Sequence, residues 1–222
     1  CQNCKSSFVV EPEDFEFYKK MQVPPPTWCP VCRFQRRLMF WNEHNLYRKV
    51  DAHDGKEIFS VYPEQSPFKI YDHDYWLSDA WEPRDYGRDY DFTKPFFTQF
   101  KQLMLDVPWA SRVIHQLTNS DYTNQAAKLK NCYLCFNADD SENCLYGVGF
   151  YHCKECIDFY DTDRSELCYE VFSIYNSFKT FFSIEGDNNR DSWFLFNCLD
   201  CSDCFACADL RHKKYYIYNV PY

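Results

Sequence analysis

The chain has 222 residues, of which 45% are hydrophobic and 20% are aromatic, and its formal net charge is −9. This composition supports one large or two modest domains with a sizeable core, and it excludes an intrinsically disordered chain. The longest apolar runs are far shorter than the roughly 18 residues of a membrane-spanning helix, so we expect a cytoplasmic protein without membrane association. The first residue is not Met, which leaves open whether the true N-terminus is missing.

Charge and cysteine are distributed unevenly along the chain. Acidic side chains dominate between residues 51 and 210, and such a surface repels phosphate backbones. Of the 14 cysteines, four lie in the first 32 residues and ten lie between positions 132 and 207. The gap between the two groups indicates two separate uses of sulfur.

Residues 1–45 are predicted to form a zinc-binding knuckle module. Cys1 and Cys4 make one C-x2-C pair, and Cys29 and Cys32 make a second. Four thiolates from two tight turns can close a tetrahedral shell around one structural zinc ion, with Zn–S distances of about 2.3 Å. Two disulfides or four free thiols are the alternatives, but a C-x2-C pair is poorly placed to bridge internally.

Two short helices are expected around these knuckles, over residues 11–20 and 33–41, in a treble-clef or ribbon-like arrangement. The second of them starts at the second knuckle and carries Arg33, Arg36 and Arg37 on adjoining positions. These three arginines are candidate phosphate contacts, which is a common use of such fingers. In the alternative interpretation, they pair with the acidic body of the same protein.

Residues 46–90 are predicted to form a β-hairpin module, which could be a degenerate finger. Strands are expected at residues 46–50 and 57–62, and a second hairpin at residues 68–81. The two turns carry Asp51 and His53, and Asp72 and His73. Oxygen and nitrogen ligands of this kind make the four residues candidates for a second metal site, with ordinary surface turns as the alternative.

Residues 91–118 are predicted to form a capping helix and a linker. Apolar side chains recur at helical intervals between Phe96 and Met104, and Pro108 stops the pattern. We expect this helix to plug the open end of the following repeats, because bare strand edges would otherwise face other chains.

Residues 119–222 are predicted to form a repeat region with a 12-residue period. Large side chains recur at two positions of the period, from Tyr133 to Phe205 and from Phe136 to Phe196, and a polar turn residue follows the second. One column holds small side chains, which are Cys132, Cys144, Cys156, Cys168, Thr180, Ser192 and Cys204. A fixed period without slippage is typical of a stacked solenoid, and the residue types favour short parallel strands. The predicted fold class is therefore mainly β, with a C-terminal parallel β-solenoid.

The period is compatible with a 12-residue or a 24-residue turn. A narrow coil holds only small side chains, at every third position, and the run Cys198, Cys201, Cys204 and Cys207 has this spacing. Both large columns would then lie outside and need a cover from the front of the chain or from a second subunit. A 24-residue turn takes them inside, and we favour it for this reason.

The same four cysteines superficially match an iron–sulfur sequence. Their place in the repeat favours small buried thiols instead, because regular coils would spread the sulfurs around the turn. Disulfides between stacked columns are the next alternative.

Four stretches of the chain carry a family resemblance: residues 28–33 (WCPVCR) with the Arg-Arg-Leu at 36–38, residues 86–92 (YGRDYDF), residues 130–134 (KNCYL), and residues 203–207 (DCFAC) ahead of Leu210. Together they resemble an uncharacterised family of cysteine-rich repeat proteins with N-terminal zinc knuckles, from candidate-phylum bacteria with small genomes. The resemblance spans nearly the whole chain and implies zinc knuckles and a repeat half, but no activity. In that family, Cys tends to stand near the first middle turn, where this chain has Asp51 and Asp54, and this departure weakens the second metal site.

Three classes of function remain. A non-catalytic scaffold or protein-binding module is favoured, with a protein partner or self-association, because solenoids act through long regular faces. The alternative is RNA or DNA binding through the basic front of the chain. A metal-dependent enzyme or a thiol and metal handler comes third, and we assign no catalytic residue to it.

Overall fold

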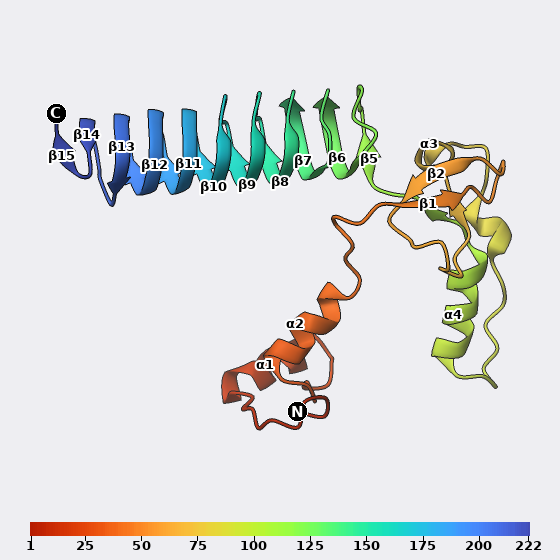
Figure 1. Ribbon diagram of the computed structural model, residues 1–222. Helices are drawn as coiled ribbons and strands as arrows, with labels where there is room; N and C mark the ends of the chain where they lie inside the picture. The colour runs from red at the N-terminus through yellow and green to blue at the C-terminus, as the bar shows by residue number, and fades with distance from the viewer. The chain divides into compact units, whose positions relative to one another are not determined.

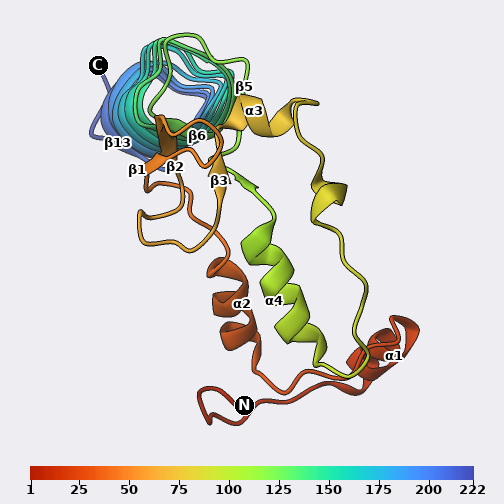
Figure 2. The same cartoon turned by 90° about the vertical axis from the view of Figure 1, so that its right-hand side faces the viewer.

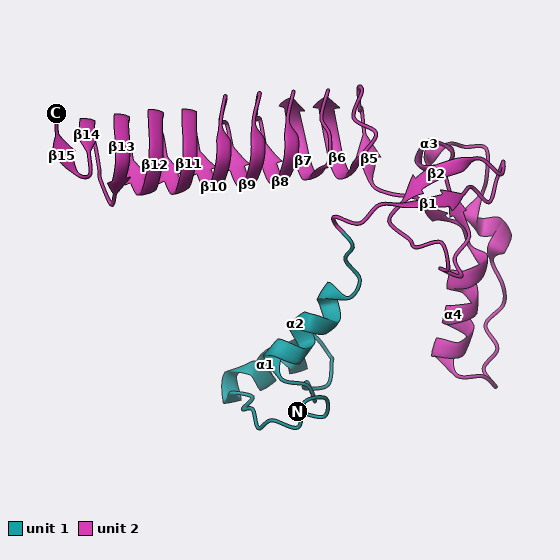
Figure 3. Cartoon of the chain, viewed as in Figure 1, with its two compact units in different colours: residues 1–42 teal, residues 43–222 magenta.

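The computed structural model describes residues 1–222 and divides into two compact units, Cys1–Asn42 and Glu43–Tyr222 (Figure 3). Strands far outnumber helices, which confirms the predicted mainly β class. None of the helices has the length and apolar character needed to cross a lipid bilayer.

The first unit contains two helices, α1 (Pro12–Lys20) and α2 (Pro30–Leu38). Each begins with proline in its first turn, where the missing N–H has no intrahelical acceptor to lose. In α1, Glu13 and Asp14 stand in the first turn and lysines in the last, which suits the helix dipole. Both helices were predicted, but α2 begins at Pro30 and so builds the second knuckle into its first turn.

The second unit opens with a β-hairpin. β1 (Tyr47–Val50) and β2 (Glu57–Ser60) pair in antiparallel fashion, and the Arg48 guanidinium donates across them to Glu57 at 2.8 Å. Gly55 lies in the turn with a φ of 77°, a left-handed conformation that favours glycine. The first predicted hairpin is therefore confirmed.

The second predicted hairpin is wrong. β3 (Ile70–Tyr71) pairs in parallel with the distant β4 (Trp109–Ala110). After β3 the chain enters a helix, α3 (His73–Leu77), because the Asp72 carboxylate accepts a hydrogen bond from the Asp74 N–H at 3.0 Å and caps it. The Asp-rich stretch that suggested a hairpin turn is thus a helix N-cap.

A 3₁₀ turn, η1 (Pro83–Tyr86), precedes the predicted helix, which is present as α4 (Phe96–Asp106). The apolar side of α4 lines a cavity of about 450 Å³ together with Trp76 and Trp109. The Trp109 indole N–H also donates to the Met104 carbonyl at 2.8 Å, which ties the end of α4 to β4. These contacts hold the helix to the module that precedes the solenoid.

Other residues meet the first coils of the solenoid, which corrects the prediction that this helix plugs the open end. Phe59 of β2 packs on Tyr122 with ring centroids 4.7 Å apart, and His44 stacks on Phe136 at 5.4 Å. Arg112 donates hydrogen bonds to two carbonyls of the first coil. The hairpin and the segments beside it, rather than α4, supply these contacts.

The solenoid is a single stack of strands that follow one another in chain order (Figure 1). Each strand pairs in parallel with residues 12 positions further on, as in Tyr169 with Phe181, and only the last pair is antiparallel. The strands are β5 (Ile114–His115), β6 (Thr123–Lys130), β7 (Cys135–Glu142), β8 (Leu145–Tyr151), β9 (Ile157–Asp163), β10 (Tyr169–Tyr175), β11 (Phe178–Asp187), β12 (Arg190–Leu199), β13 (Ser202–Ala208), β14 (Lys214–Ile217) and β15 (Val220–Pro221). The predicted parallel β-solenoid is confirmed, and its first strand pair begins slightly before the predicted start at residue 119.

Each 12-residue repeat makes one full turn of the solenoid, so the 24-residue turn that we favoured is wrong. From Gln125 to Tyr218 every third residue has a positive φ, for example 52° at Asn137 and 48° at Asp140. Each such residue bends the chain, and the bends of one 12-residue repeat close a narrow coil (Figure 2). Asn and Asp tolerate this conformation better than most residues, which explains the polar turn columns.

The interior of the coil is filled by every third residue. Small side chains dominate, and a glycine makes room for the largest of the exceptions. Phe150 is fully buried and its ring lies 4.6 Å from that of Phe159. A Cβ atom at Gly147 would lie only 2.4 Å from the Phe159 ring, so this glycine makes the room that the two rings need.

The ten later cysteines are free and buried, which confirms the prediction of small buried thiols for Cys198, Cys201, Cys204 and Cys207. Their S–H groups donate to backbone carbonyls: Cys198 Sγ lies 3.4 Å from the Phe196 oxygen and 3.5 Å from the Cys207 oxygen. Burial raises the pKa of Cys204 to about 11. At neutral pH this thiol is therefore protonated and acts as a packing group and a hydrogen-bond donor.

Candidate metal centre and aromatic surface

The two C-x2-C knuckles come together in the first unit. Cys1 and Cys4 lie in the turn that opens the chain, while Cys29 directly precedes α2 and Cys32 lies in its first turn. All four Sγ atoms lie within 4.8 Å of one another. The structure therefore gathers the four predicted ligands into one group that could hold a metal ion.

The sulfur spacing suits a tetrahedral ion. Metal–sulfur bonds of about 2.3 Å in a tetrahedral shell place neighbouring sulfurs roughly 3.8 Å apart. The Sγ atoms of Cys4 and Cys29 are 3.8 Å apart, and none of the four cysteines is in a disulfide. The donor set thus fits a metal that accepts four thiolates.

Neighbouring polar groups support thiolates at this centre. The Asn3 side chain donates to Cys32 Sγ at 3.4 Å, and the Cys29 N–H donates to Cys1 Sγ at 3.2 Å. A hydrogen bond from Ser6 lowers the pKa of the exposed Cys4 thiol to about 6. Hydrogen-bond donors that contact metal-binding sulfurs in this way orient them towards the metal.

The neighbouring sulfurs nevertheless oppose the ionisation of Cys32. Although the hydrogen bond from Asn3 lowers the pKa of Cys32, burial and the neighbouring thiols of Cys29 and Cys4 outweigh it and raise the pKa. A bound cation would remove this conflict, because it favours the charged form of every sulfur around it.

The candidates for a second metal site have other contacts. The Asp51 carboxylate accepts hydrogen bonds from the backbone N–H of His53 at 2.8 Å and of Asp72 at 3.1 Å, so it joins the two segments. The His53 ring stacks on Tyr75 with centroids 3.6 Å apart, and buried His73 lies 2.9 Å from the Arg112 carbonyl. A metal at these four residues stays a prediction.

The three arginines of α2 have distinct environments. Arg36 lies over the Trp28 ring, 5.1 Å from its centroid. The Nε atom of Arg33 is buried without a hydrogen-bond partner, and Arg37 is exposed in the last turn of the helix. None of the three forms an ion pair within the first unit, so the role of these residues in phosphate binding stays a prediction.

The narrow coil creates a feature that our preference for a wide coil missed. The two large columns point outward. The column between them, which directly follows the first and includes Phe182 and Phe194, points outward in part as well. The rings form ladders such as Tyr160 on Phe172 at 5.4 Å and Phe182 on Phe194 at 5.0 Å. We call the exposed large apolar members of these columns between residues 157 and 218 the aromatic surface: Ile157, Tyr160, Tyr169, Phe172, Phe182, Ile184, Trp193, Phe194, Phe196, Phe205, Ile217 and Tyr218. The polar turn residues and the cysteines at every third position were the sequence signal for this arrangement.

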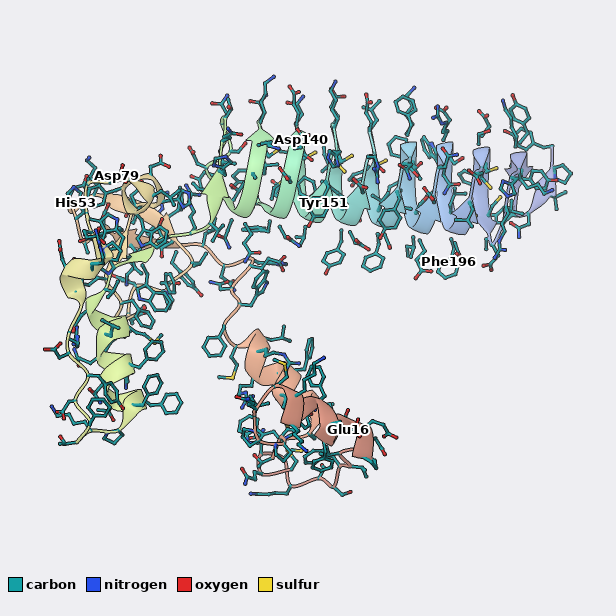
Figure 4. The ribbon with its side chains drawn as sticks, turned by 180° about the vertical axis from the view of Figure 1, so that it is seen from behind. Glu16, His53, Asp79, Asp140, Tyr151 and Phe196 are labelled. Atoms are coloured by element: carbon teal, nitrogen blue, oxygen red, sulfur yellow. The ribbon has the colours of Figure 1, made fainter.

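The other sides of the coil are polar. Figure 4 shows Phe196 of the aromatic surface and Asp140 on opposite sides of the solenoid. The polar sides satisfy many of their own charges, as in the ion pair of Lys130 with Glu142 at 2.7 Å. The solenoid is therefore a tube with one apolar and one charged flank.

Comparison with known proteins adds no assignment to this geometry. No family model matches the chain, and a search of the curated proteins finds no match. The function therefore has to be argued from the four-cysteine centre and the aromatic surface themselves.

Proposed function

We propose that this protein is a non-catalytic binding or assembly module, in which a zinc ion stabilises the first unit and the solenoid presents the aromatic surface to a protein partner. The observation that carries the proposal is the outward orientation of the large columns on a 12-residue coil. Exposed apolar patches beyond a few hundred Å² on soluble proteins generally mark interaction sites.

The architecture of the solenoid supports a presenting role. Each coil is hydrogen-bonded to its neighbours along the whole stack, and side-chain ladders such as the Asn131 amide donating to Asn143 at 3.0 Å repeat on its outside. A surface built on such a stack keeps its shape when a partner binds, so little conformational entropy is lost. Rigid, regular faces are how solenoid proteins bind.

The chemistry of the interior also favours a structural use of sulfur. Burial raises the pKa of Cys198 as well as that of Cys204, and both thiols donate to backbone carbonyls. Reactive cysteines need an accessible thiolate, which these sites disfavour. The solenoid thiols fit packing and hydrogen bonding better than redox or metal chemistry.

Zinc is the metal that suits the first unit best, because it prefers four thiolates in a tetrahedral shell. We expect one zinc ion per chain by elemental analysis of the purified protein. Replacing Cys29→Ser and Cys32→Ser should remove it, whereas Cys201→Ser, a matched change in the solenoid, should leave it in place. Retention of zinc by the double variant would contradict the assignment.

The binding role is tested with a photo-activated cross-linking residue placed at single positions. Phe172 belongs to the aromatic surface, whereas Phe178 is an outward aromatic of β11 whose ring lies near Lys179 Nζ. In an extract of cells that produce the protein, the probe at position 172 should form protein adducts and the probe at 178 should form few. Equal yields at the two positions, or no adducts, would contradict a binding role for the aromatic surface.

Nucleic-acid binding is the second candidate, and the exposed basic end of α2 favours it. Arg36 and Arg37 lie together in the last turn of this helix, where a phosphate can reach them. If the chain binds single-stranded RNA in this way, affinity should fall steeply with added salt and should fall further in Arg36→Ala with Arg37→Ala. Binding that is insensitive to added salt and to the two arginine substitutions would exclude this candidate function.

A further inference from the structure

We propose that the aromatic surface binds a second copy of this chain, so that two solenoids pack side by side through the same residues. This inference rests on the proposed function and names the partner.

The exposed area is large enough for a stable dimer. The members of the aromatic surface are 37–73% exposed. Because large apolar side chains have about 150–250 Å² each to bury, their exposed parts add up to roughly 1,000 Å² per copy. Stable interfaces bury about 800 Å² per partner, and the largest patch on a typical monomer is about 300–600 Å².

The charge pattern favours a copy of the same chain. The two large columns hold no charged residue between Tyr133 and Val220, although the chain carries a net charge of −9. A two-fold interface places each patch against itself, so a charged patch would repel its copy. In the column between them, the only acids are Asp158 and Glu170, both outside the stretch from Phe181 to Phe205 where the rings are densest.

One end of the second large column, to which Phe136, Phe172 and Phe196 belong, is already covered within the chain. Phe136 occupies the position that Phe172 and Phe196 hold further along, but the stacked His44 ring helps to reduce its exposure to 6%. Phe172 and Phe196 are 46% and 50% exposed. At this end the column therefore packs against a neighbouring group of the same unit.

End-to-end stacking of coils is a less favourable way to pair. At the last coil β15 runs antiparallel to β14, and the Asn219 side chain both donates to and accepts from the Ala208 backbone. These bonds use edge groups that a further parallel coil would need. The lateral aromatic surface remains the larger site for a second copy.

The test is sedimentation equilibrium of the full chain between about 1 and 100 µM. We expect a mass close to two chains at the upper concentrations. The double variant Phe172→Asp with Phe196→Asp should weaken dimerisation at least about 100-fold, because each charge enters the interface twice. Phe178→Asp, the same change on the polar flank, should leave the dimer intact.

Two sedimentation results would overturn the inference: a monomer throughout this range, or a dimer that the double variant leaves unchanged although circular dichroism shows it folded. The cross-linking probe at Phe172, used on a mixture of isotopically light and heavy purified protein, should give mixed adducts of two copies. If purified protein gives only adducts within one chain, the partner is not a second copy of this chain. The proposed function would survive that result if the same probe captures another protein in extract, and it fails with the inference if neither preparation gives an intermolecular adduct.

Discussion

The two units use cysteine in opposite ways. In the first unit four sulfurs face one another within 4.8 Å, and hydrogen bonding lowers the pKa of Cys4 to about 6. In the solenoid each S–H donates to a carbonyl of the wall, and burial raises the pKa of Cys204 to about 11. The comparison teaches that C-x2-C spacing alone does not define a metal site. Two such pairs on facing turns bring their sulfurs together, whereas the same spacing on the wall of a coil directs each sulfur to the backbone.

Metal removal should have the largest effect and should affect the two units differently. Structural zinc contributes roughly 10–16 kcal/mol to the folding of small zinc modules, so a chelator should unfold residues 1–42. The solenoid contains no ligand of this centre and should keep its structure. Hydrogen exchange followed by mass spectrometry, with and without chelator, measures both units in one experiment, and equal loss of protection in both would contradict the division.

A cavity in the coil should affect only the solenoid. Phe150→Ala removes the largest fully buried side chain and should lower the free energy of unfolding by about 3–5 kcal/mol. Chemical denaturation measures this loss of unfolding free energy, and the zinc content of the protein should not change. A loss below about 1 kcal/mol would show that Phe150 is not enclosed by the coil.

The fit of the interior is tested by adding a single methyl group. Gly147→Ala places a Cβ against the Phe159 ring and should cost about 1–3 kcal/mol through overpacking. Combining it with Phe159→Leu should recover part of the loss, because the smaller side chain vacates the space. If the two changes are simply additive in denaturation experiments, the proposed contact is absent.

The smallest effect should come from pH. The pKa of Cys204 is raised from an ordinary 9.0 to about 11, so this group contributes stability that is present below about pH 9. That contribution is lost as the pH rises through about 11, because the folded thiol must then ionise. The denaturation midpoint of the solenoid should fall over this window, and Cys204→Ala should make the fall shallower.

The solenoid and the metal centre could be predicted because each depends on local spacing. A 12-residue period from Cys132 to Cys204 aligns the same residue types in every coil, and two C-x2-C pairs can close one site wherever the intervening chain brings them together. Neither inference required knowledge of distant contacts.

The coil width and the second hairpin could not be predicted in the same way. The burial argument favoured a wide coil because a narrow coil leaves side chains such as Phe172 and Trp193 outside, in need of a cover, whereas the positive φ angles close each 12-residue repeat into a coil of its own. The hairpin failed because β3 pairs with β4, which follows only after α3 and α4, and because Asp72 caps a helix. Long-range pairing and capping compete with local turn propensity, and the sequence pattern alone does not rank them.

Coil width is the central claim, because it turns the aromatic columns outward. Amide–amide nuclear Overhauser contacts in the full chain measure it directly. Adjacent parallel strands are about 4.8 Å apart, so we expect contacts between residues 12 positions apart, as between the strands of Phe172 and Ile184. Contacts between residues 24 positions apart, such as those near Phe172 and Phe196, without the 12-residue contacts would contradict the account.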